Sequence, residues 1–200
     1  MDRKPWDVHP DLTEERLIIA AGLLQDVRHE ALPYHDMDKG DTNWGLGTRV
    51  SERSWHALRE AAFVYPWLQI INPGRHFVFA IGGVPLRFYR GVPEKPNRRT
   101  LARQFQEIRQ HQVAFEFFQN GTEYFWRLAV ETDITGEVLQ IVVAEMSEQG
   151  DVRSQWVVPL ERKISALSLV SERRSAGVEL PPPMVQGKKA KLKLVKKSDK

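Results

Sequence analysis

Three segments of the chain alternate apolar and polar side chains with a period of two. Apolar residues fall on alternate positions of the segments 126–130, 139–143 and 152–158, with Ser154 as the one exception. This is the period of a strand with one buried face, and turn-forming residues at 133–136 and 147–151 separate the segments. The pattern predicts an antiparallel meander with one face in the core of the protein.

Two earlier strands are predicted on either side of Gly82-Gly83, a dipeptide typical of tight hairpin turns. They cover 76–81 and 84–90, and a shorter strand at 67–71 precedes them. In this register two apolar pairs face each other: Phe77 with Phe88, and Phe79 with Leu86. The opposite face carries His76, Val78, Arg87 and Tyr89.

Three helices are also predicted. The first begins at a capping box formed by Asp11 and Glu14 and ends at Pro33, after which residues 34–47 form a loop. The second opens near Ser51 and stops before Pro66, and the third runs from about Arg98 past Ile108. Residues 113–118 either extend the third helix or pair with 124–130 across Asn120-Gly121, and this dipeptide slightly favours the hairpin.

These elements predict an α+β fold, with helices packed on a mainly antiparallel sheet built from hairpins and a meander. Residues 1–160 are expected to form a single globular domain, and 161–172 an apolar segment. Residues 173–200 contain three consecutive prolines and then a lysine-rich stretch, so we expect a stiff linker followed by a flexible, disordered basic tail.

The composition excludes several classes of protein. With no cysteine, the chain has no disulfide, no thiolate metal site and no thiol nucleophile. It begins without the apolar run of a signal peptide, and its apolar stretches are shorter than the roughly 18 residues that span a bilayer. We therefore expect a cytoplasmic protein with no membrane partner, no cofactor, no metal and no small-molecule substrate.

The net charge of +3 conceals an asymmetry between the body and the tail. Residues 188–200 carry seven lysines and one acidic residue, which gives +6, whereas the other 187 residues carry 22 basic and 25 acidic side chains. The body is therefore mildly acidic. We expect the tail to steer the protein toward an acidic partner, with four lysines as the steering residues: Lys188, Lys189, Lys191 and Lys193. Simple solubilisation, or association with phosphates or anionic lipid, stays open as an alternative.

Two clusters of charged residues do not match the metal sites that they suggest. The histidines of the first, His29 and His35, are six residues apart with Pro33 between them, whereas metal-binding helices place histidines four apart. The acidic residues of the second, Glu131, Asp133 and Glu145, lack the lysine of a common nuclease pattern because position 147 is serine. The first cluster therefore indicates a solvated helix end and loop, and the second does not support a metal-dependent nuclease.

The polar hairpin face of His76, Arg87 and Tyr89 resembles the surface with which RNA-cleaving toxins perform general acid–base chemistry. The same side chains also occur on the solvated face of an ordinary half-buried sheet. An enzyme acting on RNA or DNA is therefore the alternative function.

The most informative segment is Ala166-Leu167-Ser168-Leu169-Val170. It resembles the peptide by which many proteins dock on the bacterial DNA sliding clamp: a glutamine, a leucine, a serine or aspartate, a second leucine and a large apolar residue. Leu167, Ser168 and Leu169 match this pattern, and Val170 supplies the last apolar residue. Ala166 departs from it by standing in the place of the glutamine. The alternative is a short helix in which Leu160, Ile164 and Leu167 cover an edge of the sheet.

The clamp-like peptide and the small body resemble the SocB family, the replication-blocking toxins of bacterial toxin–antitoxin pairs. The resemblance implies a non-enzymatic, protein-binding toxin that occupies the peptide groove of the sliding clamp of bacterial DNA polymerase and inhibits DNA replication. It also implies an antitoxin that acts as a proteolytic adaptor and delivers the toxin to the ClpXP protease.

Overall fold

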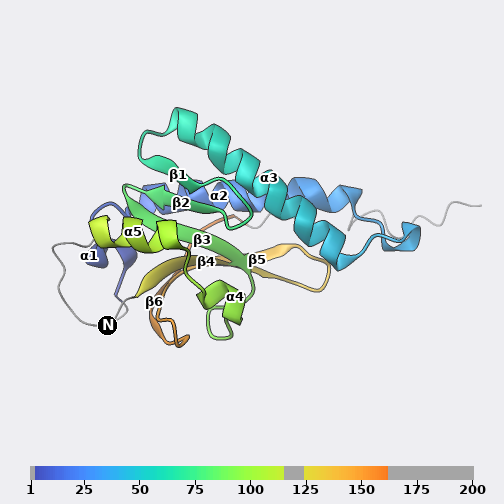
Figure 1. Ribbon diagram of the computed structural model, residues 1–200. Coiled ribbons are helices and arrows are strands. Elements are labelled where there is room, and N and C mark those ends of the chain that lie inside the picture. The colour runs from blue at the N-terminus through green and yellow to red at the C-terminus, as the bar shows by residue number, and fades with distance from the viewer. Residues whose placement is uncertain (1–2, 115–123, 162–200) are drawn as a thin grey trace, which may run out of the picture.

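The computed structural model describes residues 3–114 and 124–161, which contain one six-stranded sheet (Figure 1). Its strands follow one another in the same order in the chain and in the sheet: β1 (Leu68–Asn72), β2 (Val78–Ile81), β3 (Val84–Arg90), β4 (Phe125–Thr132), β5 (Val138–Met146) and β6 (Val152–Val157). All neighbours are antiparallel except β3 and β4, which are parallel. Parallel strands need a crossover connection, so the chain crosses the sheet between β3 and β4.

Helices cover both faces of this sheet (Figure 1). They are α1 (Pro5–Val8), α2 (Glu14–Ala31), α3 (Asn43–Val64), α4 (Arg98–Leu101) and α5 (Phe105–Ala114), with 3-10 turns at Leu32–Tyr34 (η1) and Met37–Lys39 (η2). The long helices α2 and α3 pack on one face, and α4 and α5 of the crossover lie on the other. The predicted α+β fold is confirmed.

The main core lies between the sheet and α2 and α3. Trp126, Leu128 and Val130 alternate along β4 and point toward these helices, as the period of two predicts. On α2 the fully buried Leu17, Ala20 and Ala21 recur at helical spacing and meet them. Small alanines on α2 allow the helix to approach the large aromatic side chains of the sheet closely.

The hairpin of β2 and β3 forms as predicted. Phe79 pairs with Leu86, and the rings of Phe77 and Phe88 lie 6.4 Å apart. Gly82 and Gly83 both have positive φ, at 56° and 94°, which explains why the turn uses glycine. A Cβ on Gly82 would also lie 2.3 Å from the side chain of Asp11.

The predicted starts of the first two helices are wrong. The N-cap of α2 is Thr13, whose hydroxyl accepts from the Arg16 amide, while the Asp11 carboxylate instead binds the Arg16 guanidinium at 2.9 Å. Helix α3 begins at Asn43 rather than near Ser51, because Thr42 caps it and two glycines are tolerated within its first turns. The predicted loop 34–47 therefore contains turn η2 and the start of α3.

The predicted third helix is broken into α4 and α5. Arginines on the sheet bind the carbonyls at the break: Arg127 Nε donates to Thr100 O at 3.0 Å, and Arg87 Nη1 to Ala102 O at 2.7 Å. These carbonyls therefore accept hydrogen bonds from the sheet. Beyond the break, α5 reaches Ala114, and β3 and β5 occupy the two edges of β4. Both edges of β4 are thus taken by described strands, and residues 115–118 of the hairpin considered with β4 lie outside the described residues.

The prediction of one buried face also fails for β4. Its first six residues are all buried, since α4 and α5 cover the face opposite the main core. The most unusual side chain on that face is Arg127, 1% exposed, which forms an ion pair with the fully buried Glu107 of α5.

We predict that Glu107→Gln destabilises the fold by about 3–5 kcal/mol, because it leaves the charge of Arg127 buried without its partner. The double variant Arg127→Met/Glu107→Leu should lose much less than the two single variants together, because it removes both charges. Urea denaturation measures these differences. A single variant that loses less than about 1 kcal/mol would show that the ion pair does not hold the crossover in place.

Candidate functional site

The predicted docking and steering residues lie outside the described residues. They are Ala166, Leu167, Ser168, Leu169 and Val170, and the lysines Lys188, Lys189, Lys191 and Lys193. The structure does describe the chain up to Glu161, five positions before Ala166. The geometry around Glu161 therefore shows where the chain leaves the described part of the protein.

The chain leaves between β5 and α2. After β6 ends, the Val158 amide donates to Ile141 O at 2.9 Å, which continues the pairing by one step. The chain then turns toward α2, where Gln25 Nε2 donates to Glu161 O at 2.8 Å. Gln25 is itself 5% exposed, so this hydrogen bond fixes Glu161 to the body.

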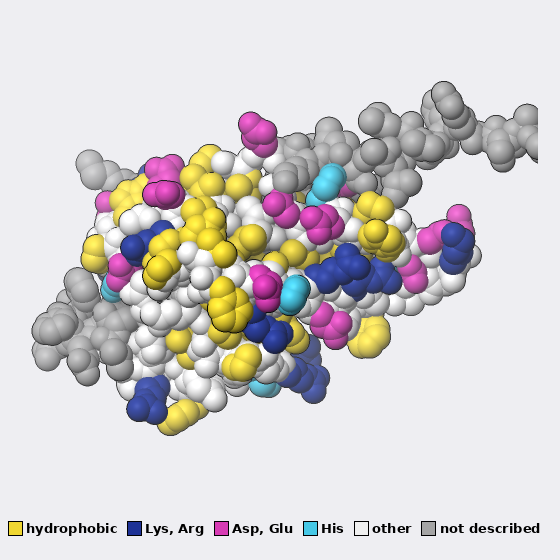
Figure 2. All heavy atoms as spheres, turned by 90° about the horizontal axis from the view of Figure 1, so that it is seen from above, with side chains coloured by type: hydrophobic (Ala, Val, Ile, Leu, Met, Phe, Trp, Pro, Cys, Tyr) yellow, Lys and Arg dark blue, Asp and Glu magenta, His cyan; other side chains and the backbone are white. Residues whose placement is uncertain are grey.

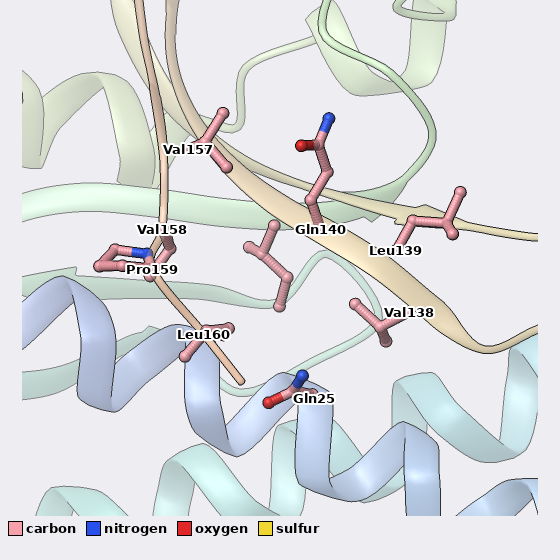
Figure 3. Close-up of a pocket in the computed structure, with 9 residues that line it drawn as sticks. Gln25, Val138, Leu139, Gln140, Val157, Val158, Pro159 and Leu160 are labelled. Carbon is pink, nitrogen blue, oxygen red and sulfur yellow. The ribbon is translucent and has the colours of Figure 1, made fainter. Parts of the chain in front are cut away.

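A pocket of about 270 Å³ lies beside this exit (Figure 3). Most of its lining is apolar and comes from the start of β5, the end of β6 and the residues that follow it: Val138, Leu139, Ile141, Val157, Val158, Pro159 and Leu160. Two glutamines, Gln25 and Gln140, complete it. Such a pocket suits an apolar side chain whose backbone can meet the glutamine amides at the rim.

The hairpin face proposed for catalysis is occupied by structural contacts. Arg87 binds Ala102 O and lies 4.0 Å from the Glu107 carboxylate, and its side chain is only 14% exposed. The Tyr89 hydroxyl donates to Val92 O, and burial raises the pKa of Tyr89 to about 12. His76 lies exposed in the turn before β2. Arg87 and Tyr89 thus share a face of β3, and both hold parts of the crossover.

The group around Glu107 is the most strongly charged buried site in the described part of the chain. Arg127 binds its carboxylate and also stacks on Phe125, with the guanidinium carbon 4.2 Å from the ring centre. Burial lowers the pKa of Arg127 to about 10, which still leaves it charged at neutral pH. Arg103, nearby, forms an ion pair with Glu148 at 2.8 Å. This arrangement fastens the crossover to the sheet.

Sequence reasoning missed Arg127 and Glu107. Arg127 stands at a polar position of the alternating segment, where a charged residue is normally read as solvent-exposed. The available signal was the helix predicted just before β4 in the chain, because a helix between strands can cover the second face.

The acidic residues in and beside the two charged clusters of the sequence have separate structural roles. Asp133 accepts hydrogen bonds from Thr135, which lower its pKa, and Glu131 accepts from Gln140, while Glu145 is buried near Arg153. In the loop after α2, Asp36 pairs with Lys39. Within residues 3–114 and 124–161, no group of three histidine, aspartate or glutamate side chains is placed to hold a metal ion.

The surface over α3 is chemically mixed. Figure 2 shows apolar, basic and acidic side chains intermingled on this face. Near the junction of α2 and α3, Tyr34, Met37 and Trp44 are 67%, 68% and 80% exposed, and Arg53 stacks on Tyr34. Aromatic residues, methionine and arginine are enriched in protein interfaces, so this end of the helical pair has the composition of a contact surface.

Comparisons with known proteins identify no relative: no protein-family model, no curated protein and no solved structure matches the chain. None of the helices in the described ranges is long and apolar enough to cross a membrane.

We predict that Glu145→Gln raises the melting temperature near pH 7. Burial raises the pKa of Glu145, so the folded state holds its proton more tightly than the unfolded chain does. The stability that this proton contributes is complete below the ordinary pKa of 4.5 and declines as pH rises through the folded pKa. The gain from the neutral glutamine should therefore vanish in acid, and melting curves at several pH values measure it.

The exposed Glu60→Gln is the matched control, because it also removes one carboxylate. A lower melting temperature for Glu145→Gln at pH 7 would show that attraction to Arg153 and Arg3 outweighs the cost of burial.

Proposed function

We propose that this chain is a non-enzymatic, protein-binding toxin of the cytoplasm that docks on the sliding clamp of bacterial DNA polymerase and blocks replication. The observation that carries this proposal is the segment Ala166–Val170, in which Leu167, Ser168, Leu169 and Val170 match the clamp-docking pattern. Polymerases use the same groove of the clamp, so an occupant of that groove would exclude them.

The chemistry of the segment suits an apolar groove. Leu167 and Leu169 are two residues apart, so in an extended peptide their side chains point to the same side. Val170 adds a further apolar contact, and the backbone can pair with the walls of the groove. Ala166 lacks the amide of the usual glutamine, which costs about 1–3 kcal/mol, or one to two decades of affinity.

The folded body gives this peptide a fixed attachment point, and its size would obstruct the clamp surface around a bound peptide. Gln25 holds Glu161, and the motif begins five positions later, so a bound peptide would bring the folded body close to the clamp. The lysines at 188–193 would raise the rate of encounter with an acidic surface. By the same resemblance, an antitoxin would act as a proteolytic adaptor and deliver this chain to the ClpXP protease.

Two of the three residues of the hairpin face, Arg87 and Tyr89, are poorly placed for general acid–base catalysis. A general acid or base needs a pKa near the working pH and access to the substrate. Tyr89 has its pKa raised to about 12, and the guanidinium of Arg87 is bound to Ala102 O. Both side chains are therefore engaged in holding the crossover.

We predict that a peptide covering residues 164–171 binds purified sliding clamp weakly, and that Ala166→Gln strengthens binding at least about tenfold. The restored amide would satisfy polar groups at the rim of the groove. Fluorescence polarisation with labelled peptides measures both affinities, and Leu169→Ala is the control that should abolish binding.

Two results would contradict the proposal. The first is that both the natural and the Ala166→Gln peptide fail to bind the clamp. The second is cleavage of RNA or DNA by the pure full-length protein that is lost in His76→Ala and retained in Leu169→Ala, because this would assign the activity to the hairpin face.

A further inference from the structure

The pocket beside the exit of the chain owes its shape to an irregularity in the sheet. Glu131 pairs with Gln140 and Thr132 with Val138, so Leu139 is an extra residue in β5. Such a bulge bends a strand and displaces the extra residue. Leu139 is accordingly 49% exposed although it is a large apolar side chain at the edge of a buried strand.

On its other edge, away from β4, the start of β5 is left open by β6. Within the described residues, β6 pairs with Val142–Met146, and only the Val158 amide continues this pairing, to Ile141. Residues 138–140 of β5 therefore have no described strand beside them on this side. Val157, 52% exposed, lies at the opposite wall of the pocket (Figure 3).

The pocket has room for an apolar group. Its volume is about 270 Å³, and a cavity of about 150 Å³ is enough for a benzene-sized group. Ile141 and Val158, 0% and 3% exposed, form its buried part, so the pocket connects the protein surface with the main core. Filling it with an apolar side chain would extend that core.

The position of the exit identifies the occupant. Leu160 lines the pocket, and Gln25 holds the next residue, Glu161, at its rim. The first large apolar residues that follow are Ile164, Leu167 and Leu169, which are three, six and eight positions further along the chain. At a maximum of about 3.3–3.6 Å per residue, all of them can reach the pocket. A tether this short gives a local concentration on the order of millimolar.

We propose that segment 164–170 of this same chain docks reversibly in the pocket and thereby withholds its leucines from the clamp. This inference rests on the proposed function, since it assigns a regulatory contact to the same peptide. The two docked states exclude each other because each one buries Leu167 and Leu169. The apparent affinity for the clamp is therefore reduced by the fraction of chains in which the peptide is bound to its own body.

The first experiment introduces a positive charge at the pocket of the full-length protein. Val157→Lys and Leu139→Lys, both at exposed positions, should strengthen binding of the chain to purified clamp by about three- to tenfold. The matched control is Val64→Lys at the end of α3, which is 69% exposed and lies by β1, across the sheet from the pocket. It adds the same charge and should leave the affinity unchanged. Equal effects of Val157→Lys and Val64→Lys would overturn the inference.

The second experiment does not depend on the clamp. Methyl NMR of the full-length protein should show that the double change Leu167→Ala/Leu169→Ala shifts the signals of Ile141 and Val157 and leaves that of Val64 in place. Unchanged pocket signals would overturn the inference even if the peptide binds the clamp. If the pocket signals shift but the peptide does not bind the clamp, the intramolecular contact stands and only the proposed function is refuted.

The same spectra distinguish docking within one chain from occupation of the pocket by a second copy of the chain. The expected shift is independent of protein concentration, because the contact lies within one chain. A shift that grows with concentration would assign the pocket to a second copy of the chain and would overturn intramolecular docking.

Discussion

The parallel pairing of β3 and β4 is the constraint on which the rest of the fold depends. It requires the chain to cross the sheet, and the crossing segment must be held against a face that would otherwise meet water. Arg127 and Glu107 hold it there by an ion pair inside the protein, while Arg87 binds the break between α4 and α5. Such a pair is costly to bury and more costly to break, because the loss of one partner leaves the other charge buried and uncompensated.

The second face of the sheet determines what each polar side chain can do. Because the crossover covers β3 and β4, Arg87 and Tyr89 become part of its attachment. The other side of the sheet remains less covered at the start of β5, because β6 pairs only with Val142–Met146 and the extra residue Leu139 is displaced there. There the chain leaves the body at Glu161, close to the peptide that the sequence singles out.

Local patterns in the sequence predict the elements whose residues interact with near neighbours. Gly82-Gly83 predicts the hairpin, and the alternation around Leu128 predicts the buried face toward α2 and α3. The partner of Arg127, by contrast, lies 20 positions away on a helix, and no local rule pairs an arginine of a strand with it. The docking peptide can be read directly from the sequence. The pocket could not be predicted, because it depends on where β6 ends and on one extra residue in β5.

The central claim is that Leu167 and Leu169 carry the interaction of this chain with the sliding clamp. Calorimetric titration of the full-length protein into purified bacterial clamp, beside a double variant with both leucines changed to alanine, tests it most directly. The account predicts saturable binding by the natural chain and none by the variant, with both chains folded, as a cooperative thermal transition of each shows. Binding that survives the loss of both leucines would contradict it.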